Sequence, residues 1–348
     1  MGASHARANV IQSKPMIARR RRRDDTGLAT LAAVAILASL LAFRWFGPFS
    51  SPSAAPECSG DCSANVSGGG PPAGDQQDRL TTTADSPDGA PYITAISAAV
   101  VDEKCGDLIF AKDAHRRLPP ASITKIMTAI VAVETSDLDD TVDVNVDDFY
   151  AGDSTVMGLE TGMRLSLRDL MYGLLLPSGN DAAIAIARYV AGDVPAFVNR
   201  MNAKVRALGL QDTNFTNPHG LDAPGHYSSA YDMAMLGRYA MKNPEIAEIV
   251  KTKTWQPNWS GPELWNGNLL LWLYPDSDGM KIGWTEKAGQ TIVASAQRDG
   301  RRLFIALMGS QDRYTDTIRL FDWAFSDSQW AQSGGDCQAV SAAAQSGQ

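Results

Sequence analysis

The chain has 348 residues, of which 44% are hydrophobic and 20% charged, values typical of a globular protein with one large domain or two small ones. Its formal net charge of −8 is unevenly distributed: residues 1–50 hold eight Lys or Arg and two Asp, whereas the remainder holds 23 Lys or Arg and 37 Asp or Glu. An acidic main body excludes nucleic acid as a main partner, because phosphate binding needs a basic face.

The N-terminal region has the pattern of a membrane anchor. Five arginines at 19–23 precede an uncharged apolar stretch at 27–43, and Trp45 follows it. This stretch is just long enough to span a bilayer, and a tryptophan at its edge suits the lipid interface. We therefore predict a cytoplasmic basic tail at 1–25 and a single-pass transmembrane anchor in the cell membrane at 26–46, with the rest of the chain extracytoplasmic.

A cleaved signal peptide is the alternative to a retained anchor, because the small residues that end at Ala55 could form a cleavage site. The protein would then be secreted. The Ser-, Pro- and Gly-rich segment 47–90 predicts a flexible tether, since such a composition cannot bury enough apolar surface to fold. Globular composition returns at 91–330, and 331–348 is predicted to be a disordered tail.

The globular segment predicts a mixed α+β domain. Alternating apolar residues favour strands at 93–101, 108–111, 291–296 and 303–308, with tight turns inside each pair. Apolar residues at helical spacing predict helices at 121–134, 165–176, 181–191, 194–208, 229–241 and 315–325. Strands, then helices, then strands and a helix indicate an antiparallel sheet built from both ends of the domain, with a helical lobe inserted between them.

The first motif with chemical potential is Ser122-Ile123-Thr124-Lys125. Serine and lysine three residues apart share one face of a helix, so the amine can reach the hydroxyl. The motif opens a helix, where free N–H groups and the positive dipole end favour an oxyanion. Alone it is weak, because a helix-capping serine beside a solvated lysine gives the same pattern.

Two more short motifs follow, Ser178-Gly179-Asn180 between two helices and Lys281-Ile282-Gly283 before a probable strand. Each alone is typical of a turn with a helix cap or of a strand entry. Together with the first motif, and in this order, they correspond to the active-site set S-x-x-K, S-D-N and K-T-G of penicillin-binding proteins and class A β-lactamases.

The surrounding sequence resembles the low-molecular-mass penicillin-binding proteins, the serine-type D-Ala-D-Ala carboxypeptidases. The resemblance covers about 91–325 and includes LPPASITKIMTAIVAVE, NFTNPHGLD and DGMKIGWTEKAGQ. It implies a β-lactamase/transpeptidase-like fold, with an antiparallel sheet, flanking helices, a helical lobe and an active site between the lobes. It also implies hydrolysis of the terminal D-Ala-D-Ala bond of peptidoglycan stem peptides, with release of D-alanine, and acylation by β-lactam antibiotics such as penicillins.

The resemblance assigns catalytic roles to four residues. Ser122 would attack the carbonyl of the penultimate D-alanine, and Lys125 would take its proton. A lysine is a useful base only if burial or a nearby cation lowers its pKa. Ser178 would relay a proton to the leaving amine, and Asn180 would orient the lysine.

Five further residues are expected to bind substrate. Lys281 would supply the nearby cation and attract the substrate carboxylate. Gly283 and Trp284 follow on the same strand, and the backbone N–H of Trp284 would join that of the nucleophile in an oxyanion hole. Thr285 and Arg313 are candidates for the terminal carboxylate, which suits an arginine fork.

One residue departs from the family pattern, since Ile282 stands where the family has Thr or Ser. Isoleucine cannot replace a hydroxyl hydrogen bond, whose loss would cost about 1–3 kcal/mol. Its side chain could instead point away from the cleft, as alternate strand residues do. We expect reduced but real activity, with Thr285 binding the carboxylate. A catalytically weakened cell-wall-binding pseudoenzyme is the alternative.

Other interpretations of the same residues are less favoured. A Ser-His triad through His219 is not needed when a lysine serves as base, and a β-lactamase would need a carboxylate on a separate loop, for which Glu263 lies too close to the third motif. The residues do not separate a carboxypeptidase from a DD-endopeptidase or weak transpeptidase acting on the same bonds. The Trp-rich segment 255–284 is expected to pack as a hairpin, with sugar stacking or membrane contact as alternatives.

Cysteine and histidine usage predicts no metal site and no other cofactor, because no Cys/His cluster has zinc-ligand spacing. The four cysteines fit an oxidising compartment and allow three disulfide pairings, between which the sequence does not choose. They are Cys58, Cys62, Cys105 and Cys337.

Overall fold

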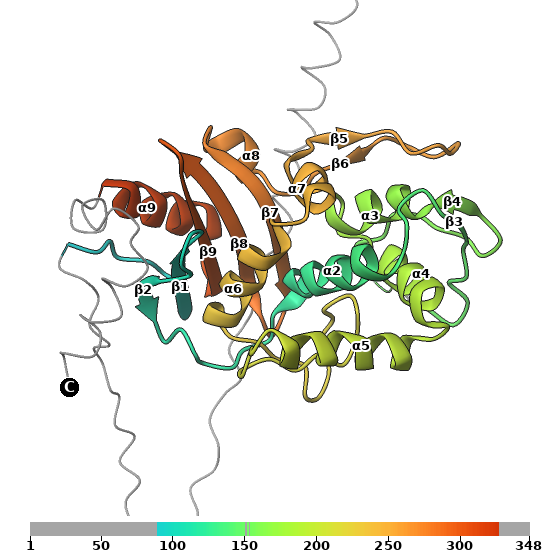
Figure 1. Ribbon diagram of the computed structural model, residues 1–348, viewed down its shortest axis with the longest axis horizontal. Helices are drawn as coiled ribbons and strands as arrows, with labels where there is room; N and C mark the ends of the chain where they lie inside the picture. The colour runs from blue at the N-terminus through green and yellow to red at the C-terminus, as the bar shows by residue number, and fades with distance from the viewer. Residues whose placement is uncertain (1–88, 150–151, 153, 327–348) are drawn as a thin grey trace, which may run out of the picture. The chain divides into compact units, whose positions relative to one another are not determined.

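A five-stranded antiparallel sheet forms one half of the domain (Figure 1). The computed structural model describes residues 89–149, 152 and 154–326, which all belong to one compact unit. The strand order is β2-β1-β9-β8-β7. Its members are β1 (Ser97–Asp102), β2 (Leu108–Lys112), β7 (Ser277–Thr285), β8 (Gly289–Arg298) and β9 (Arg301–Ser310). Both ends of the domain supply strands, which confirms the predicted sheet.

The two central strands, β8 and β9, show why this sheet forms. Six consecutive residues of each are buried, because α6 (Ala230–Ala240) packs on one face of the sheet and α9 (Arg313–Ser326) on the other. The predicted turn between them is confirmed. Asp299 and Gly300 both have positive φ, 51° and 76°, as a two-residue type I′ hairpin requires.

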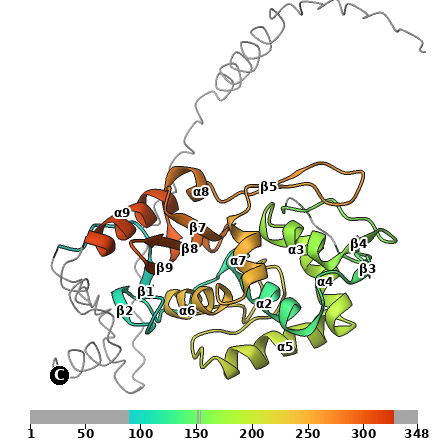
Figure 2. The ribbon, with the colours of Figure 1, turned by 45° about the horizontal axis from the view of Figure 1, so that its top comes forward.

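The helical lobe lies beside the sheet, with α6 between the two (Figures 1 and 2). Its central helix, α2 (Lys125–Thr135), buries its first eight residues, so it is surrounded on all sides. A 3₁₀ helix, η1 (Ala121–Thr124), leads directly into it. The other helices that pack around it are α3 (Leu167–Leu175), α4 (Asn180–Ala191) and α5 (Val194–Ala207). The predicted helical lobe is therefore confirmed, although the first turn at Ala121 is 3₁₀ rather than α.

Several short elements were not predicted from the sequence. The helix expected from 165 begins later, because Arg164–Ser166 forms strand β4, paired with β3 (Thr141–Asp143). A helix, α7 (Pro244–Lys251), is capped by Asn243, whose side chain accepts hydrogen bonds from two backbone N–H groups of the first turn. The remaining elements are β5 (Thr254–Trp255), β6 (Leu264–Trp265) and α8 (Leu270–Leu273).

Cys105 follows β1 and is disulfide-bonded. The other three cysteines lie outside the described residues, so the pairing stays open. The predicted N-terminal basic tail and the predicted anchor also lie outside the described residues, and so does nearly all of the predicted tether. The same holds for the predicted C-terminal tail. In the part of the chain that the structure describes, no helix combines the length and hydropathy that a membrane span requires.

Candidate active site

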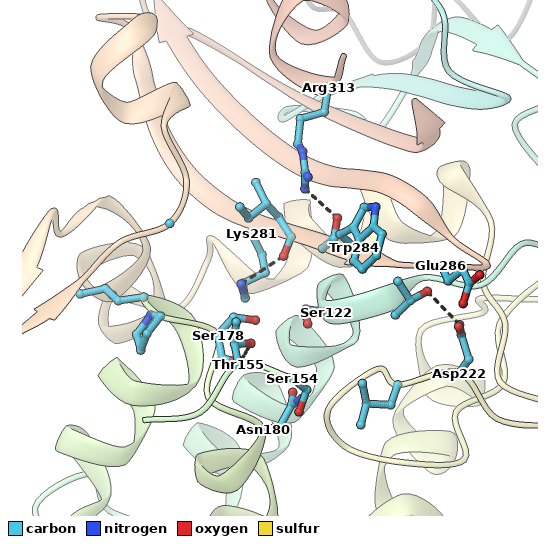
Figure 3. Close-up of a pocket in the computed structure, with 17 residues that line it drawn as sticks. Ser122, Ser154, Thr155, Ser178, Asn180, Asp222, Lys281, Trp284, Glu286 and Arg313 are labelled. Atoms are coloured by element: carbon cyan, nitrogen blue, oxygen red, sulfur yellow. Dashed lines mark hydrogen bonds between the residues drawn. The ribbon is translucent and has the colours of Figure 1, made fainter. Parts of the chain in front are cut away.

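Ser122 lies in the wall of a pocket of about 550 Å³ that the sheet edge and the helical lobe both line (Figure 3). It occupies η1, directly before α2. The residue before it, Ala121, has a φ of 52°, a left-handed conformation that is uncommon for a residue with a side chain. The chain therefore bends sharply at the point where it presents the serine.

Two glycines allow other backbone segments to approach this bend. A Cβ at Gly283 would lie 2.6 Å from the backbone nitrogen of Ser122, and a Cβ at Gly220 would lie 2.0 Å from the carbonyl oxygen of Ala121. Neither position has room for a side chain. Strand β7 consequently runs against the N–H group of the serine, as an oxyanion hole shared with this strand requires.

Lys125 is fully buried and its amine makes three contacts. Its Nζ lies 2.9 Å from Ser122 Oγ, 2.5 Å from Asn180 Oδ1 and 2.7 Å from the backbone oxygen of His219. The amide and backbone oxygens can only accept hydrogen bonds. A neutral amine would give them its two N–H groups, and its lone pair would then face the serine hydroxyl.

The surroundings of Lys125 favour this neutral form. Burial, and secondly the charge of Lys281, hold the pKa of Lys125 well below its usual value of 10.5, and the carboxylate of Asp181 only partly opposes them. Lys281 is itself buried, and burial together with the charge of Arg313 lowers its pKa to about 7. Repulsion between the two amines therefore disfavours the state in which both are protonated.

Ser178 presents an unsatisfied hydroxyl to the pocket. It has a φ of 70°, and its buried Oγ has no hydrogen-bond partner within the described ranges. Its carbonyl accepts a hydrogen bond from Thr155 Oγ1 at 2.9 Å, and the carbonyl of Thr155 accepts one from the Asn180 N–H. A buried hydroxyl without a partner in a pocket wall is suited to a ligand.

Asp181 holds this part of the wall in place. Its carboxylate accepts backbone hydrogen bonds from Met157 and Ala182 on one oxygen and from Gly158 and Leu159 on the other, at 2.7–2.9 Å. The side chain is buried. A single carboxylate thus fixes the loop between β3 and β4 against the start of α4.

We expect Asp181→Asn to lower the free energy of unfolding by about 2–4 kcal/mol, because an amide NH₂ would face two backbone N–H donors and leave them unpaired. Urea denaturation followed by circular dichroism would measure this change. Asp193→Asn is a matched control, since Asp193 accepts one N–H at an exposed helix cap and asparagine caps equally well. Equal stability of the two variants would contradict the expectation.

Two cations mark one end of the pocket (Figure 3). Arg313 Nη1 donates to the carbonyl oxygens of Gly283 and Thr291 at 2.6 Å and 3.1 Å, and its Nε donates to Gln290 at 3.0 Å. These bonds fix the guanidinium plane beside β7. Lys281 lies in the same wall, so this end is prepared for an anionic group.

Two carboxylates, Asp222 and Glu286, lie at the opposite end, with Ser122 between them and the cations (Figure 3). The hydroxyl of Thr285 donates to Asp222 Oδ1 at 2.9 Å and accepts from the N–H of Ala288 at 3.0 Å. Its single proton is thus occupied, and binding a substrate carboxylate would require that proton to leave Asp222. Arg313 and Lys281 are better placed for the predicted carboxylate.

Ile282 borders the pocket although it lies on the other face of β7 from Lys281. Burial alternates along this edge strand, with Lys281, Gly283 and Thr285 buried and Trp284 exposed. The Ile282 side chain packs against the hydrophobic core between the sheet and α9. Ile282 therefore contributes an apolar surface without a hydroxyl to the pocket rim at the cationic end.

His219 does not have the geometry of a triad member. It contributes its carbonyl oxygen to Lys125, and its Nδ1 accepts the N–H of Leu221 at 3.2 Å. Burial lowers the pKa of the ring to about 3, so the imidazole is neutral. Glu263 is exposed and is not among the residues that line the pocket.

The sequence did not identify eight other residues of the pocket wall. Asp222 and Leu221 belong to the stretch NFTNPHGLD and Glu286 belongs to DGMKIGWTEKAGQ, both of which the family resemblance had marked, and Leu176 and Pro177 directly precede Ser178. The other three carry no local signal. The eight are Ser154, Thr155, Leu176, Pro177, Leu221, Asp222, Gly267 and Glu286. The described residues contain no group of three or more His, Cys, Asp or Glu side chains that could hold a metal ion.

The sheet, the helical lobe and the serine–lysine pair in the cleft define the fold class of the penicillin-binding proteins. The solved structure of penicillin binding protein 6B from Escherichia coli matches with a TM-score of 0.65 and 37% identity, over 71% of this chain and 81% of that chain. A D-alanyl-D-alanine carboxypeptidase from Mycobacterium tuberculosis matches with a TM-score of 0.65 and 35% identity, over 70% of this chain and 96% of that chain.

Sequence comparison leads to the family. The D-alanyl-D-alanine carboxypeptidase family model, peptidase S11, matches residues 81–312. D-alanyl-D-alanine carboxypeptidase DacD of Salmonella typhimurium is 40% identical over 249 residues, which are 67% of this chain and 63% of that relative. The chain therefore belongs to the D-alanyl-D-alanine carboxypeptidase family, which confirms the resemblance, and its match spans less than two-thirds of that relative's length.

Proposed function

We propose that this protein is a serine-type D-Ala-D-Ala carboxypeptidase that hydrolyses the terminal bond of peptidoglycan stem peptides and is acylated by penicillins. The observation that carries the proposal is the amine of Lys125, which is buried, has a lowered pKa and lies 2.9 Å from Ser122 Oγ. A neutral amine in this position can take the serine proton as the oxygen attacks. The similarity to D-alanyl-D-alanine carboxypeptidases supports the choice of substrate.

In the acylation step, the terminal carboxylate of the substrate binds at Lys281 and Arg313. The scissile carbonyl then lies next to Ser122, and its oxygen points to the backbone N–H groups where β7 meets η1. Serine Oγ forms a bond to the carbonyl carbon while its proton passes to Lys125. The C–N bond breaks as the proton is delivered to the departing amine.

Ser178 suits the delivery of that proton. Its hydroxyl has no hydrogen-bond partner in the described part of the chain, and it lies in the same pocket wall as Lys281. A hydroxyl can accept a proton from one side while it donates its own to the other. Water then attacks the ester with Lys125 again as base, which restores the serine and releases the shortened peptide.

The pKa of Lys281 predicts a pH dependence. Lys281 carries its charge below about pH 7 and loses it above. We expect kcat/KM for carboxylate-terminated peptides to fall above pH 7, by at most about tenfold per pH unit, because the neutral amine attracts the carboxylate less. An acid limb should report protonation of Lys125. Steady-state rates across pH would measure both limbs.

Lys281→Arg provides the control for this profile, since arginine stays charged throughout the range. Its kcat/KM is expected to be lower overall but to show no fall just above pH 7. An alkaline limb that persists unchanged in Lys281→Arg would assign that limb to another group.

The function itself is tested by two measurements on the purified full chain. Benzylpenicillin should increase the intact mass by one penicillin molecule, and a peptide ending in D-Ala-D-Ala should release D-alanine. The absence of both would reject the enzyme in favour of a cell-wall-binding pseudoenzyme. An adduct without D-alanine release would reject the carboxypeptidase activity alone.

The same proposal includes a single-pass membrane anchor that places the domain outside the cytoplasm. The charge pattern of the N-terminal 50 residues supports it, and so does the disulfide bond of Cys105, because disulfides persist in oxidising compartments. The chain should remain in the membrane fraction after a carbonate wash. Its appearance in the soluble, secreted fraction with a shortened N-terminus would favour a cleaved signal peptide.

A further inference from the structure

Gln290 lies behind the cationic end of the pocket and holds Arg313. Its side-chain oxygen accepts hydrogen bonds from the backbone N–H of Arg313 at 3.2 Å and from the guanidinium Nε at 3.0 Å. Its amide nitrogen donates to the carbonyl of Gln311 at 2.9 Å. One amide therefore ties the first residue of α9 and the turn before it to the start of β8. Gln290 is not among the residues that line the pocket, so its effect on a ligand passes through Arg313.

The position of Gln290 on β8 explains why its side chain reaches α9. Ile292, two residues further along the strand, packs in the core between the sheet and α9, and residues two apart share one face of a strand. Gln290 therefore faces the same helix, at the end where α9 begins. The pairing of β8 with β9 shifts between Gln290 and Ile292, and such a β-bulge marks the end of regular pairing.

The contacts of Arg313 leave one nitrogen of its guanidinium for a ligand (Figure 3). Nη1 donates to the carbonyls of Gly283 and Thr291, which are paired residues of β7 and β8. Nε donates to Gln290. Within the described ranges, no hydrogen bond engages Nη2. Its two N–H groups can therefore donate to a carboxylate oxygen.

The charge of Arg313 has no carboxylate partner, in contrast to other arginines of the sheet. Arg298 on β8 pairs with Asp276 at 2.7 Å. Arg302 on β9 pairs with Asp278 at 2.8 Å. Among the described residues, no carboxylate forms an ion pair with Arg313. The pocket arginine is thus oriented by an uncharged amide, which leaves its positive charge available to a substrate.

The carboxylates closest to Arg313 in the chain are engaged elsewhere. That of Asp312 accepts hydrogen bonds within the first turn of α9, from the N–H and the hydroxyl of Thr315. That of Asp316 is buried and accepts hydrogen bonds from the segment 94–95. The remaining titratable neighbour is the phenol of Tyr314, whose ring centre lies 5.9 Å from the guanidinium carbon. None of these groups takes over the role of Gln290.

We propose that Gln290 is a positioning residue for the terminal carboxylate of the substrate, because its neutral amide fixes the guanidinium of Arg313 and leaves the positive charge uncompensated. A glutamate would fix the same group but offset its charge. An apolar residue would preserve the charge but release the guanidinium from one of its contacts. This inference rests on the proposed serine acyl-enzyme function, in which that carboxylate places the scissile carbonyl next to Ser122.

The first test compares two substrates of the full-length protein in detergent, diacetyl-Lys-D-Ala-D-Ala and the ethyl thioester of diacetyl-Lys-D-Ala. Both form the same acyl-enzyme, but the leaving group of the thioester has no carboxylate. Gln290→Glu should lower kcat/KM for the tripeptide by about tenfold, mainly through KM, because the new carboxylate offsets the charge of Arg313 and repels that of the substrate. The thioester should change by less than about twofold. Gln290→Met stays neutral and should lower kcat/KM for the tripeptide by about threefold, because the guanidinium is held less firmly.

The second test uses the alkaline limb of the pH profile. Lys281 faces Arg313 from α9 and Lys125 from the helical lobe, and burial together with the charge of Arg313 lowers its pKa to about 7. A carboxylate at position 290 would offset that charge, so Lys281 should keep its proton to higher pH. The fall in kcat/KM should then begin about half a pH unit higher in Gln290→Glu and stay in place in Gln290→Met. The two carboxylates at the opposite end of the pocket are the same in every variant.

Gln211→Glu is the matched control, since Gln211 is exposed and does not line the pocket, and both rates and the pH profile should stay native. An equal loss on tripeptide and thioester in a folded Gln290→Glu protein, with the alkaline limb in place, would overturn the inference and leave a purely structural contact. If Gln290→Glu does not fold by circular dichroism, Gln290→Met decides, and an unchanged ratio of its two rates would likewise overturn the inference. These outcomes leave the proposed function intact. A native protein that forms no penicillin adduct and cleaves neither substrate would overturn both conclusions.

Discussion

Replacing Ser122 by alanine is expected to abolish the covalent penicillin adduct and to lower D-alanine release by about 10⁵-fold or more. The substitution removes the only atom that forms the acyl bond, while Lys125 keeps its contacts to Asn180 and His219. The pocket and the fold should therefore persist. Intact mass spectrometry after benzylpenicillin and a D-alanine assay would measure the two losses.

A matched serine provides the control. Ser260 is exposed on the loop between β5 and β6, so Ser260→Ala makes the same chemical change away from the pocket and should keep both activities. Thermal unfolding should show Ser122→Ala to be as stable as the native protein within a few degrees. An adduct of normal mass in Ser122→Ala would show that another nucleophile is acylated.

Local sequence was sufficient for those parts of the fold that local interactions determine. The Asp299-Gly300 turn could be predicted because both positions need positive φ. The strands beside it were predicted from alternating apolar residues, whereas the structure buries both of their faces. The serine–lysine spacing predicted one shared helix face, and the structure brings their side chains within 2.9 Å. In both cases the relevant contacts join residues close in the chain.

Short elements that depend on distant contacts could not be predicted in this way. In α8 and at the residue before it, Leu270 and Leu271 are buried whereas Leu269 and Leu273 are exposed, and nothing in the sequence LLLWL distinguishes these leucines. Burial is decided by packing against the sheet. Helix α7 had a local signal in Asn243-Pro244, but eight residues are too few for helical periodicity to stand out.

The same distinction applies to the site. Three motifs predicted the serine, the lysines and the amide, because their residue types carry the chemistry. The sequence could not show that Thr285 gives its proton to Asp222, since those residues are 63 positions apart and meet only through the fold. It also left open which face of β7 carries the Ile282 side chain, which the structure decides by packing it against the core under α9.

Lys125→Met is expected to slow acylation by penicillin by about 10²- to 10⁴-fold, the usual contribution of a general base. Methionine fills a similar volume but has no lone pair of comparable basicity for the Ser122 proton. The variant also leaves two oxygens, Asn180 Oδ1 and the His219 carbonyl, without the amine that donates to them. Each unpaired oxygen costs about 1–3 kcal/mol, partly offset because a buried amine no longer has to be desolvated.

Stopped-flow acylation by a chromogenic β-lactam, compared with the stability from urea denaturation, separates the loss of the base from a loss of fold. Lys287→Met is the matched control, because Lys287 is exposed just beyond β7. This variant should be acylated at the native rate. A small primary amine added to Lys125→Ala, whose shorter side chain leaves room for it, should restore part of the rate, more so at higher pH, where more of it is neutral. If Lys125→Met folds and is acylated at the native rate, another group must take the proton of Ser122. The burial of Lys125 would then need a purely structural explanation.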